Sequence, residues 1–576
     1  MKIGKLYDVR TIKNFKDMLK QSYELFSDKV AFVKKISDGN YRKITYKDFY
    51  NEVASLGTSL LKLVPERLIV CVIGENRYEW CLGYIATTNS GGTIVPMDKE
   101  LPLAEKINLI KQSNSNVIIF SGKYSKDIPE IAEKVPTLKY FVNMDIKEDE
   151  GIMLSLEKLL EKGNELIKSG DESFENAEVS SDEMSILLFT SGTMDNAKGV
   201  MLSQKNICED IMSVCKTVDV RPGDSSVSIL PLHHTYQCSL GFILFLYRGS
   251  TIYFNDGLRY IQKNLKEYAP SILITVPLLL ENMYKKIWEQ AKKKKGLTTT
   301  LKLAIVATNI LRDVFHIDIK RKVFREIHET LGGNLRLIIV GAAAISPEVS
   351  KGFSDFGMET LQGYGLTECS PLLIGNSDSV CRHGSIGIPI PGVEICINNP
   401  NEDGIGEILA KGENIMLGYL INGKVDRSCF KDGWFYTGDL GYKDKDGFYY
   451  ITGRNKNVIV TKNGKNIFPE ELEAQINKSP FVLESLVFGK YDKETGEVRV
   501  NAQIFPNMDA IKESFKSIAV SAEDVKKFLG DIIKSVNKDM PLYKHIKEFS
   551  VRDTAFIKTT TQKIKRYKEI PQQEQK

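Results

Sequence analysis

The sequence predicts an α/β protein that divides into at least two domains. In the first 180 residues, short apolar runs such as 68–73 and 116–120 alternate with amphipathic segments, as strands and helices do in layered folds. A further apolar run, 186–189, changes abruptly into a loop rich in Ser, Thr and Gly, which is typical of a buried strand that opens into a binding loop. The length of 576 residues exceeds one ordinary hydrophobic core. We therefore expect a large part with subdomains and a further, smaller domain.

Composition narrows the classes of function. The formal net charge of +4 is close to neutral for this length, so it gives no nucleic-acid footprint. The nine cysteines are scattered without a C-x-x-C pair, which argues against a zinc knuckle or a disulfide framework and fits a reducing cytoplasm. The first twenty residues lack the apolar core of a signal peptide, and apolar runs such as 272–280 are too short to span a membrane. We expect a cytoplasmic protein without a transmembrane segment, and contact with a membrane surface stays open.

The loop after the 186–189 run has the composition of a phosphate-binding loop. Hydroxyl side chains, backbone N–H groups and one cation can together hold phosphate oxygens, and they come from Thr190, Ser191, Gly192, Thr193, Lys198 and Gly199. A Walker A loop is disfavoured, because it needs Gly before the Lys and Ser or Thr after it, whereas Lys198 stands between Ala197 and Gly199. A solvated turn is the plain alternative.

This loop resembles the phosphate loop of the AMP-forming adenylating enzymes, the superfamily of acyl-CoA synthetases, luciferases and nonribosomal adenylation domains. The usual form is TSGTTG-x-PKG, from which Met194, Asp195 and Ala197 depart. The resemblance implies that the loop binds the phosphates of ATP, that Thr193 and Lys198 act in catalysis and that Thr193 also contacts Mg²⁺. We expect the Asp195 carboxylate to point away from the phosphates, because an anion beside them would repel them.

Two later segments suit an adenine and its phosphates. The segment LRLIIVGAAAISPEV ends a strand in small residues that let a flat ring approach the backbone, at Gly341, Ala342 and Ala343. The segment LQGYGLTECSP offers an aromatic ring for the base, a hydroxyl for a phosphate oxygen and a hard oxygen ligand for Mg²⁺, from Tyr364, Thr367 and Glu368. It matches the YG-x-TE motif of the superfamily, with Gly363 and Gly365 beside the tyrosine. GGTIVPMDKELP at 91–102 resembles a structural landmark of the same superfamily.

His233 and His234 stand between a Pro-interrupted apolar run and a largely apolar, helix-like segment. Two adjacent histidines do not easily chelate one metal ion and no carboxylate stands nearby in the sequence, so we expect no metal there. Packing is the plain interpretation. The resemblance implies instead that His234 has a catalytic role, borders the carboxylate substrate and begins the lining of an acyl pocket.

The C-terminal part carries the remaining motifs. In WFYTGDLG at 434–441, a lone Asp in a turn would normally be a cap, but Asp439 resembles the carboxylate that accepts both ribose hydroxyls. The resemblance further implies a ribose or phosphate contact at Arg454, a hinge at Lys456 and passage of a pantetheine arm at Gly464. FIKTTTQKIKR at 556–566 resembles the loop P-K-T-x-x-G-K, with the catalytic lysine at Lys563 and with Ile557 and Gln562 in place of Pro and Gly.

Residues 281–330 combine the basic tract AKKKKG with apolar residues at helical spacing. A charge run is usually a solvated face. The arrangement also resembles the helical insertion of long-chain fatty acyl-CoA synthetases, which separates them from short-chain relatives.

Together these motifs resemble those of AMP-forming acyl-CoA synthetases, most of all the long-chain fatty acyl-CoA synthetases. The resemblance implies an adenylation domain at 1–455 and an α+β domain at 456–576 that rotates about the hinge. ATP, Mg²⁺ and coenzyme A are the implied cofactors, and a medium- to long-chain fatty acid is the implied substrate, joined to CoA through acyl-AMP with release of AMP and pyrophosphate. Two alternatives stay open. One is an acyl-AMP ligase that loads an acyl carrier protein, and the other is a non-catalytic acyl- or nucleotide-binding protein, for which only the altered loop residues 194–197 argue.

Overall fold

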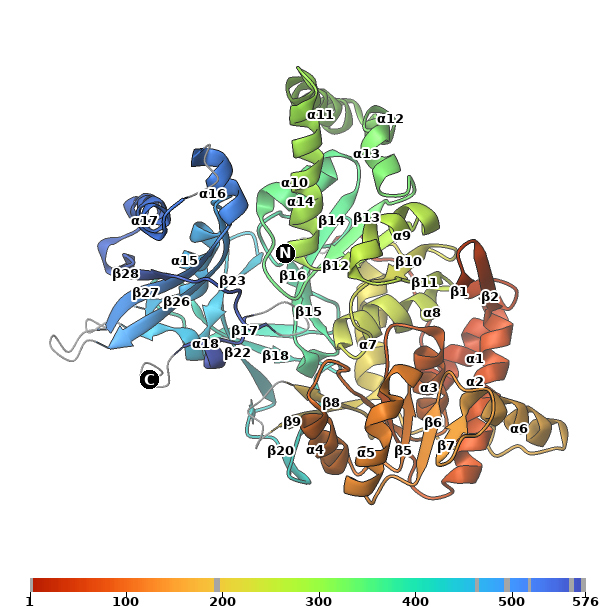
Figure 1. The fold of residues 1–576 in the computed structure, drawn as a ribbon. Helices are drawn as coiled ribbons and strands as arrows, with labels where there is room; N and C mark the ends of the chain where they lie inside the picture. Colours follow the sequence, from red (N-terminus) through yellow and green to blue (C-terminus); the bar gives the residue numbers. More distant parts are fainter. Residues whose placement is uncertain are drawn as a thin grey trace. The chain divides into compact units, whose positions relative to one another are not determined.

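The computed structural model describes residues 4–190, 197–460, 466–491, 498–515, 520–558 and 564–570, and its mixture of layered sheets and helices confirms the α/β class (Figure 1). The chain divides into two compact units. Unit 1 holds residues 1–395, 410–435 and 446–448, and unit 2 holds residues 396–409, 436–445 and 449–576. Because this division runs through one sheet, the boundary at 455/456 stays a prediction.

Unit 1 contains two large sheets. The first has nine strands in the order β20 (Lys424–Asp426), β19 (Gly418–Ile421), β9 (Lys198–Ser203), β8 (Met184–Thr190), β4 (Thr93–Pro96), β3 (Ile69–Ile73), β5 (Val117–Phe120), β6 (Tyr140–Asn143) and β7 (Met153–Ser155). The strands from β8 to β7 are parallel, whereas β9, β19 and β20 pair in antiparallel fashion. The apolar runs expected at 68–73, 116–120 and 186–189 are therefore confirmed as the strands β3, β5 and β8.

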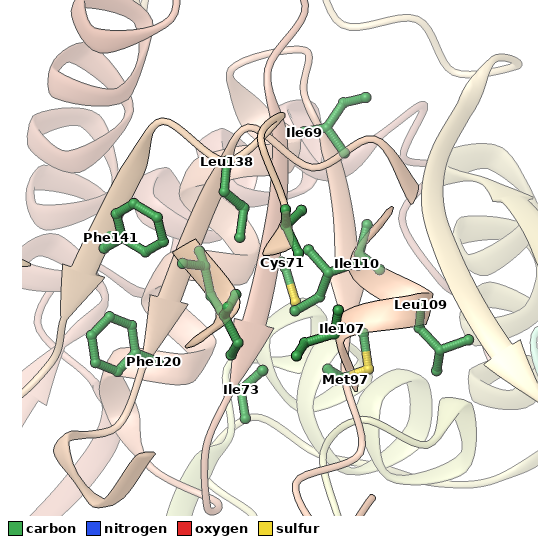
Figure 2. Packing of buried hydrophobic residues seen from close by; sticks show 14 of the residues in the cluster. Ile69, Cys71, Ile73, Met97, Ile107, Leu109, Ile110, Phe120, Leu138 and Phe141 are labelled. Atoms are coloured by element: carbon green, nitrogen blue, oxygen red, sulfur yellow. The ribbon is translucent and has the colours of Figure 1, made fainter. Parts of the chain in front are cut away.

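Alternate residues of β3 explain why this sheet is buried. Ile69, Cys71 and Ile73 point to the same side of the sheet and pack with Ile107 and Ile110 of α4 (Leu103–Ser113) (Figure 2). In addition, α3 (Tyr78–Asn89) is buried at every position. A strand that is covered on both faces is apolar at consecutive positions. The strands of this sheet were therefore recognisable in the sequence as continuous apolar runs.

The second sheet of unit 1 also has nine strands, in the order β16 (Ile388–Pro389), β15 (Leu372–Gly375), β14 (Glu359–Gly365), β13 (Leu337–Val340), β12 (Ile272–Thr275), β10 (Ser225–Ser228), β11 (Thr251–Phe254), β1 (Val30–Ser37) and β2 (Asn40–Thr45). The strands from β14 to β1 are parallel. The carboxyl ends of β12, β13 and β14 therefore lie at one edge.

The helices of unit 1 connect these strands. They are α1 (Phe15–Phe26), α2 (Tyr46–Leu63), α5 (Ile128–Lys134), α6 (Leu156–Lys168), α7 (Gln204–Thr217), a π-helix (Tyr236–Ile243) continued by α8 (Leu244–Arg248), α9 (Ile261–Tyr268), α10 (Pro277–Lys293), α11 (Leu297–Phe315), α12 (Lys320–Val323), α13 (Arg325–Thr330) and α14 (Pro347–Asp355). The segment 281–330 is helical as predicted. The apolar run 272–280 is two elements, since Pro277 begins a helix directly after β12. Among the described helices, none is long and apolar enough to cross a bilayer.

The remaining strands form smaller sheets. A five-stranded sheet joins β17 (Glu394–Asn398), β18 (Gly406–Lys411), β22 (Trp434–Lys443), β21 (Phe430–Lys431) and β23 (Tyr449–Arg454). After it come the pair β24 (Ile459–Val460) and β25 (Asn466–Ile467), the three strands β26 (Val482–Tyr491), β27 (Val498–Pro506) and β28 (Glu548–Val551), and the helices α15 (Pro469–Ile476), α16 (Met508–Phe515), α17 (Ala522–Lys538) and α18 (Arg566–Glu569). The α+β class predicted for the C-terminal part is confirmed.

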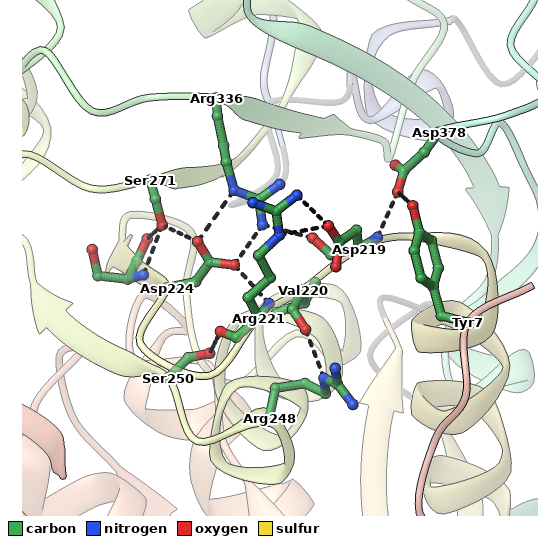
Figure 3. A network of polar contacts seen from close by, with 11 residues as sticks. Tyr7, Asp219, Val220, Arg221, Asp224, Arg248, Ser250, Ser271, Arg336 and Asp378 are labelled. Atoms are coloured by element: carbon green, nitrogen blue, oxygen red, sulfur yellow. Dashed lines mark hydrogen bonds and ion pairs between the residues drawn. The ribbon is translucent and has the colours of Figure 1, made fainter.

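A polar network joins the amino ends of the parallel strands in the second sheet (Figure 3). Asp224, just before β10, accepts hydrogen bonds from Arg336 at 2.5 Å, from the Ser271 hydroxyl at 2.7 Å and from the Arg221 N–H at 2.7 Å. Burial alone would raise the pKa of the Asp224 carboxyl, but these donors outweigh it and lower the pKa below its ordinary value. The pair of the buried Asp224 and the part-buried Arg336 therefore holds the starts of β10, β12 and β13 together.

We predict that Arg336→Met destabilises unit 1 by about 3 to 5 kcal/mol, because the buried Asp224 carboxylate loses its partner. In the wild type this contribution is complete above the unfolded pKa and is lost as pH falls through the lowered folded pKa, so the difference between the two proteins should shrink in acid. Urea unfolding followed by tryptophan fluorescence measures it, since all three tryptophans lie in unit 1.

The control is Arg221→Met, because Arg221 is 63% exposed where it pairs with Asp219. This exposed pair should contribute less than about 1 kcal/mol. Equal destabilisation by the two substitutions would contradict the role assigned to the pair of Asp224 and Arg336.

Candidate functional site

The predicted phosphate loop connects the antiparallel strands β8 and β9 of unit 1. Their pairing ends at Thr190 and Lys198, and the Thr190 hydroxyl lies 3.5 Å from the Lys198 carbonyl oxygen that accepts its hydrogen bond. Ala197, one of the departures from the family pattern, is buried in the core of the first sheet. Outside the described residues lie Ser191, Gly192, Thr193, Met194 and Asp195. The two ends of the loop are therefore adjacent, and the roles of its middle residues stay predictions.

Lys198 and Glu368 meet at Tyr419. The Lys198 ammonium lies 4.9 Å from the centroid of the Tyr419 ring, and the Tyr419 hydroxyl donates a hydrogen bond of 2.7 Å to Glu368 Oε1. Burial, together with the charge of Glu368, raises the pKa of Tyr419 well above its ordinary value, so this hydroxyl stays a donor. A cation and a carboxylate predicted from segments 170 residues apart therefore share one aromatic side chain.

The backbone after residue 412 holds this group in place. β19 pairs with β9 so that Tyr419 lies opposite Val200, and the Met416 N–H donates to the Glu368 carbonyl at 2.8 Å. The Asn414 side chain donates to the carbonyls of Cys369 and Leu372. Tyr419 was missed in the sequence because no motif marks it. The signal that could have found it is a short apolar run, 415–421, that follows the YG-x-TE segment.

The predicted adenine segments lie at neighbouring carboxyl ends. β13 and β14 are parallel with Val340 opposite Gln362, so Gly341 follows one strand beside Gly363 of the other. Tyr236, from the π-helix, packs against Gly341 and donates its hydroxyl to the carbonyls of Ile339 at 3.0 Å and Thr275 at 3.2 Å. Tyr236 is a second residue that the sequence did not indicate, since it lies 101 positions before the start of β13.

Gly365 and Gly341, both at this edge of the sheet, differ in how much space a side chain would have. A Cβ at Gly365 would lie 1.7 Å from the Pro371 carbonyl oxygen, so the packing of the chain itself excludes a side chain there. A Cβ at Gly341 would meet Tyr236 and Gly363 only at ordinary contact distances of 3.4 and 3.5 Å. Packing of the chain therefore explains why residue 365 is a glycine, without any ligand. Packing does not require a glycine at residue 341.

Two non-glycine residues beside these segments have left-handed backbones. Ala342 has φ +69° directly after Gly341, and Ser370 has φ +72° directly after the Thr367–Cys369 turn that carries Glu368. Such conformations cost free energy and cluster at functional sites. Tyr364, Thr367 and Ala343 lie in the same stretches, partly or fully accessible to solvent.

His233 has a carboxylate neighbour that the sequence analysis missed. The fold places Asp98, from the 91–102 segment, with Oδ1 at 3.6 Å from His233 Nε2, a distance too long for a hydrogen bond. Burial, with a contribution from Lys99, lowers the pKa of His233 to about 3, so the ring is neutral. The ring of His234 lies 4.2 Å from that of His233, and the backbone carbonyl of His234 accepts from the Cys238 N–H at the start of the helical segment.

A narrow gap between mostly apolar side chains, too small to hold a water molecule, lies beside Leu232 and Thr235, which flank this histidine pair. Its walls come from α3, β4, β8, α7 and the start of the π-helix, and include Tyr84, Pro96, Ile186, Leu188, Leu232 and Cys238. β8 is the strand that leads into the phosphate loop. Mostly apolar side chains therefore lie between β8 and the segment after His234.

In unit 2 the structure brings together Asp439 and Arg454. Asp439 lies inside β22 and not in a turn, so a capping role is ruled out by its position in a paired strand. It is 4% exposed, lies opposite Arg454 of β23 and forms an ion pair of 2.9 Å with its Nε. Lys456 is exposed in the turn that follows, and Gly464 lies outside the described residues.

Lys563 also lies outside the described residues, but both flanks of its segment are fixed. Lys558 and Ile564 form an antiparallel bridge. The Arg566 guanidinium bonds both carboxylate oxygens of Glu473 in α15 and donates to the Val487 carbonyl at 2.8 Å. These contacts attach the segment after Lys563 to the core of unit 2.

The donor set at Glu368 suits one kind of metal site. Among the described residues, no group of three or more His, Cys, Asp or Glu side chains could hold a metal. Mg²⁺ commonly binds through one or two carboxylates together with substrate phosphates and water, which a single Glu beside a phosphate loop can provide. Glu368 therefore fits a metal that arrives with a nucleotide.

Two family models and several known proteins match this chain. The family model described as AMP-binding enzyme matches residues 19–420, and the model described as AMP-binding enzyme C-terminal domain matches residues 456–572. Long-chain-fatty-acid–CoA ligase FadD15 of Mycobacterium bovis is 27% identical over 472 residues, which cover 79% of this chain and 76% of its own. Long-chain-fatty-acid–CoA ligase 5 of Rattus norvegicus is 28% identical over 574 residues, covering 91% and 82%.

Among solved structures, the anthranilate CoA ligase AuaEII in complex with anthranoyl-AMP is similar in fold. Its TM-score is 0.72 at 21% identity, over 98% of this chain and 97% of that chain. Since the first family model alone spans more than half of the sequence, the protein belongs to the AMP-binding enzyme family.

Proposed function

We propose that the protein is an ATP-dependent acyl-CoA synthetase that activates a medium- to long-chain fatty acid through acyl-AMP and transfers it to CoA. The observation that carries the proposal is the convergence of Lys198 and Glu368 on Tyr419 beside the predicted phosphate loop. Membership of the AMP-binding enzyme family and the names of the two relatives support it.

The first half-reaction joins the acid to AMP. A carboxylate oxygen of the acid attacks the α-phosphorus of ATP, and the bond to pyrophosphate breaks. Lys198, Thr367 and the loop hydroxyls hold the phosphates, and Lys563 stabilises the charge that develops on the carboxylate and the α-phosphate. Mg²⁺ held by Glu368, and by Thr193 on the resemblance, would neutralise phosphate charge.

Two sets of residues are assigned to the nucleotide under this proposal. The adenine lies at Gly341, Ala342, Ala343 and Tyr364, and Asp439 accepts the ribose hydroxyls with Arg454 as its partner. In the second half-reaction the CoA thiol attacks the acyl carbonyl carbon and AMP leaves. Rotation about Lys456 withdraws Lys563 and brings the face with Gly464 to the acyl-AMP.

The proposal of a fatty acid as substrate rests on the apolar side chains near His234. The gap between β8 and the segment after His234 is lined mostly by apolar side chains, which agrees with an apolar acid, and it would have to open to admit an alkyl chain. The helical segment 281–330 agrees with the resemblance to long-chain enzymes.

The direct test measures ATP-dependent thioester formation with acids of increasing chain length, using CoA and a phosphopantetheine carrier protein as acceptors. We expect CoA thioesters of medium or long acids, with one AMP and one pyrophosphate for each. Transfer to the carrier protein alone would favour the acyl-AMP ligase. Nucleotide or acid binding without any product would favour the non-catalytic alternative.

We predict that Glu368→Gln raises the Mg²⁺ concentration needed for half-maximal acyl-AMP formation, because a neutral amide is a poorer ligand for a hard cation. The variant should recover at high Mg²⁺. Glu413→Gln is the control, since Glu413 is an exposed carboxylate of the same unit that pairs with Lys205. A defect of Glu368→Gln that added Mg²⁺ does not relieve would rule out the metal-binding role.

We predict that Lys563→Ala and Gly464→Leu separate the half-reactions. Lys563→Ala should abolish acyl-AMP formation and still convert supplied acyl-AMP to thioester, whereas Gly464→Leu should do the reverse. Rapid-quench assays of each step measure this. If both variants lose both steps equally, the rotating-domain account is wrong.

We predict that Glu473→Gln, which weakens the attachment of Arg566, slows acyl-AMP formation by about tenfold, the effect of losing roughly 1.4 kcal/mol of positioning. Conversion of supplied acyl-AMP should be unchanged. The control is Glu471→Gln on the same helix, because Glu471 pairs with Lys544 at 2.7 Å and not with the Lys563 segment. Equal slowing by both variants would show a general effect on α15.

A further inference from the structure

Helix α11 (Leu297–Phe315) has apolar side chains on two opposite faces. Its inner face, which includes Leu301, Ala304 and Ile305, packs against the core of the second sheet, and Thr308 on that face is 2% exposed. In Figure 1, α11 lies with α10 and α12 at the top of the view, beyond the strands of that sheet. The inner face therefore accounts for the attachment of α11 to unit 1.

The outer face of α11 carries a row of exposed apolar side chains. Leu303 is 66% exposed, Val306 56%, Ile310 50% and Val314 65%. Their spacing of three, four and four residues puts them on one side of the helix. Single exposed apolar side chains are ordinary on soluble proteins, but a contiguous row marks a surface that binds something. We call these four residues the α11 row.

Basic residues stand at both ends of the α11 row. Lys292, Lys293, Lys294 and Lys295 precede the helix, Lys302 lies in its second turn, and Arg321, Lys322 and Arg325 follow it, all exposed. No ion pair joins Lys292–Lys295 or Lys302 to a carboxylate in the part of the chain that the structure describes. Residues 277–330 hold twelve Lys and Arg against six Asp and Glu, a net +6, whereas the whole chain carries +4. Positive charge is thus concentrated around the row.

We propose that the α11 row and its flanking lysines bind the surface of an anionic lipid bilayer. An apolar helix face sinks into the boundary between headgroups and acyl chains, and lysines beside it attract anionic headgroups. The helix lies along the surface and does not span it, in agreement with its charge at both ends. This proposal concerns a surface apart from the nucleotide segments and does not depend on the proposed function.

Charge favours a bilayer over a second copy of the chain. Two copies joined through the α11 row would bring two regions of net +6 together, and like charges across an interface oppose association. An anionic bilayer supplies both an apolar phase and the opposite charge.

The test is co-sedimentation of the full-length protein with vesicles of phosphatidylcholine mixed with phosphatidylglycerol, and with vesicles of phosphatidylcholine alone. We expect binding to the anionic vesicles that weakens as salt is added. The double variant Val306→Ser with Ile310→Ser, and separately Lys293→Gln with Lys294→Gln, should each weaken binding at least fivefold, since one lysine near an anionic surface contributes about that factor.

The matched controls are Leu258→Ser and Leu542→Ser, at side chains 75% and 78% exposed but outside the α11 row, and Lys526→Gln with Lys527→Gln on α17. These should bind as the wild type does. In addition, Ile310→Trp should gain fluorescence quenching by brominated lipid, and Leu258→Trp should not.

Several outcomes would overturn the proposal. They are absence of wild-type binding to anionic vesicles, equal loss in the row variants and the controls, and lack of quenching at position 310. Concentration-dependent dimers that Val306→Ser with Ile310→Ser makes monomeric, without vesicle binding, would assign the row to self-association instead.

Discussion

The hydrogen bond from Tyr419 to Glu368 is the interaction on which the arrangement of the candidate site depends. It exists because β19 pairs with β9, which places the ring of residue 419 beside Lys198, the first residue of β9. The Glu368 carboxylate that accepts this hydrogen bond is oriented before any ligand binds. Such preorganisation matters for phosphoryl chemistry, in which positioning and electrostatics supply most of the rate.

In the second sheet, a stabilising network lies at the amino ends of the parallel strands, and the predicted adenine segments lie at their carboxyl ends. Asp224, Ser271 and Arg336 stand just before parallel strands and form the buried network at their amino ends. Gly341 and Gly363 stand at the opposite, carboxyl ends, where ligands of open α/β sheets bind. The same parallel pairing therefore positions the residues at both ends of the strands. A substitution in the network at the amino ends would reach the candidate site through the strands that connect them.

The sequence predicted those helices and strands that a local pattern of apolar residues determines. The strands β3, β5 and β8 were visible as apolar runs because both faces of the first sheet are covered, and the helices of 281–330 were visible in their period. Tyr419, Tyr236 and Asp98 were not predicted, because each contacts its partner only through strand order or packing. The spacing of residues along the sequence predicts neither of these. A cap in a turn was the plain alternative for Asp439, and the pairing of β22 with β23 places this residue inside a strand instead.

The central claim is that the acid is activated by direct attack of its carboxylate on the α-phosphorus of ATP. The most direct measurement uses a fatty acid labelled with ¹⁸O in both carboxyl oxygens, followed by mass spectrometry of the nucleotide after one turnover. The account predicts AMP that carries one ¹⁸O atom, because the attacking oxygen stays on phosphorus when the CoA thiol displaces AMP. Unlabelled AMP with ¹⁸O in phosphate or pyrophosphate would contradict it, since the bond would then form at another phosphorus.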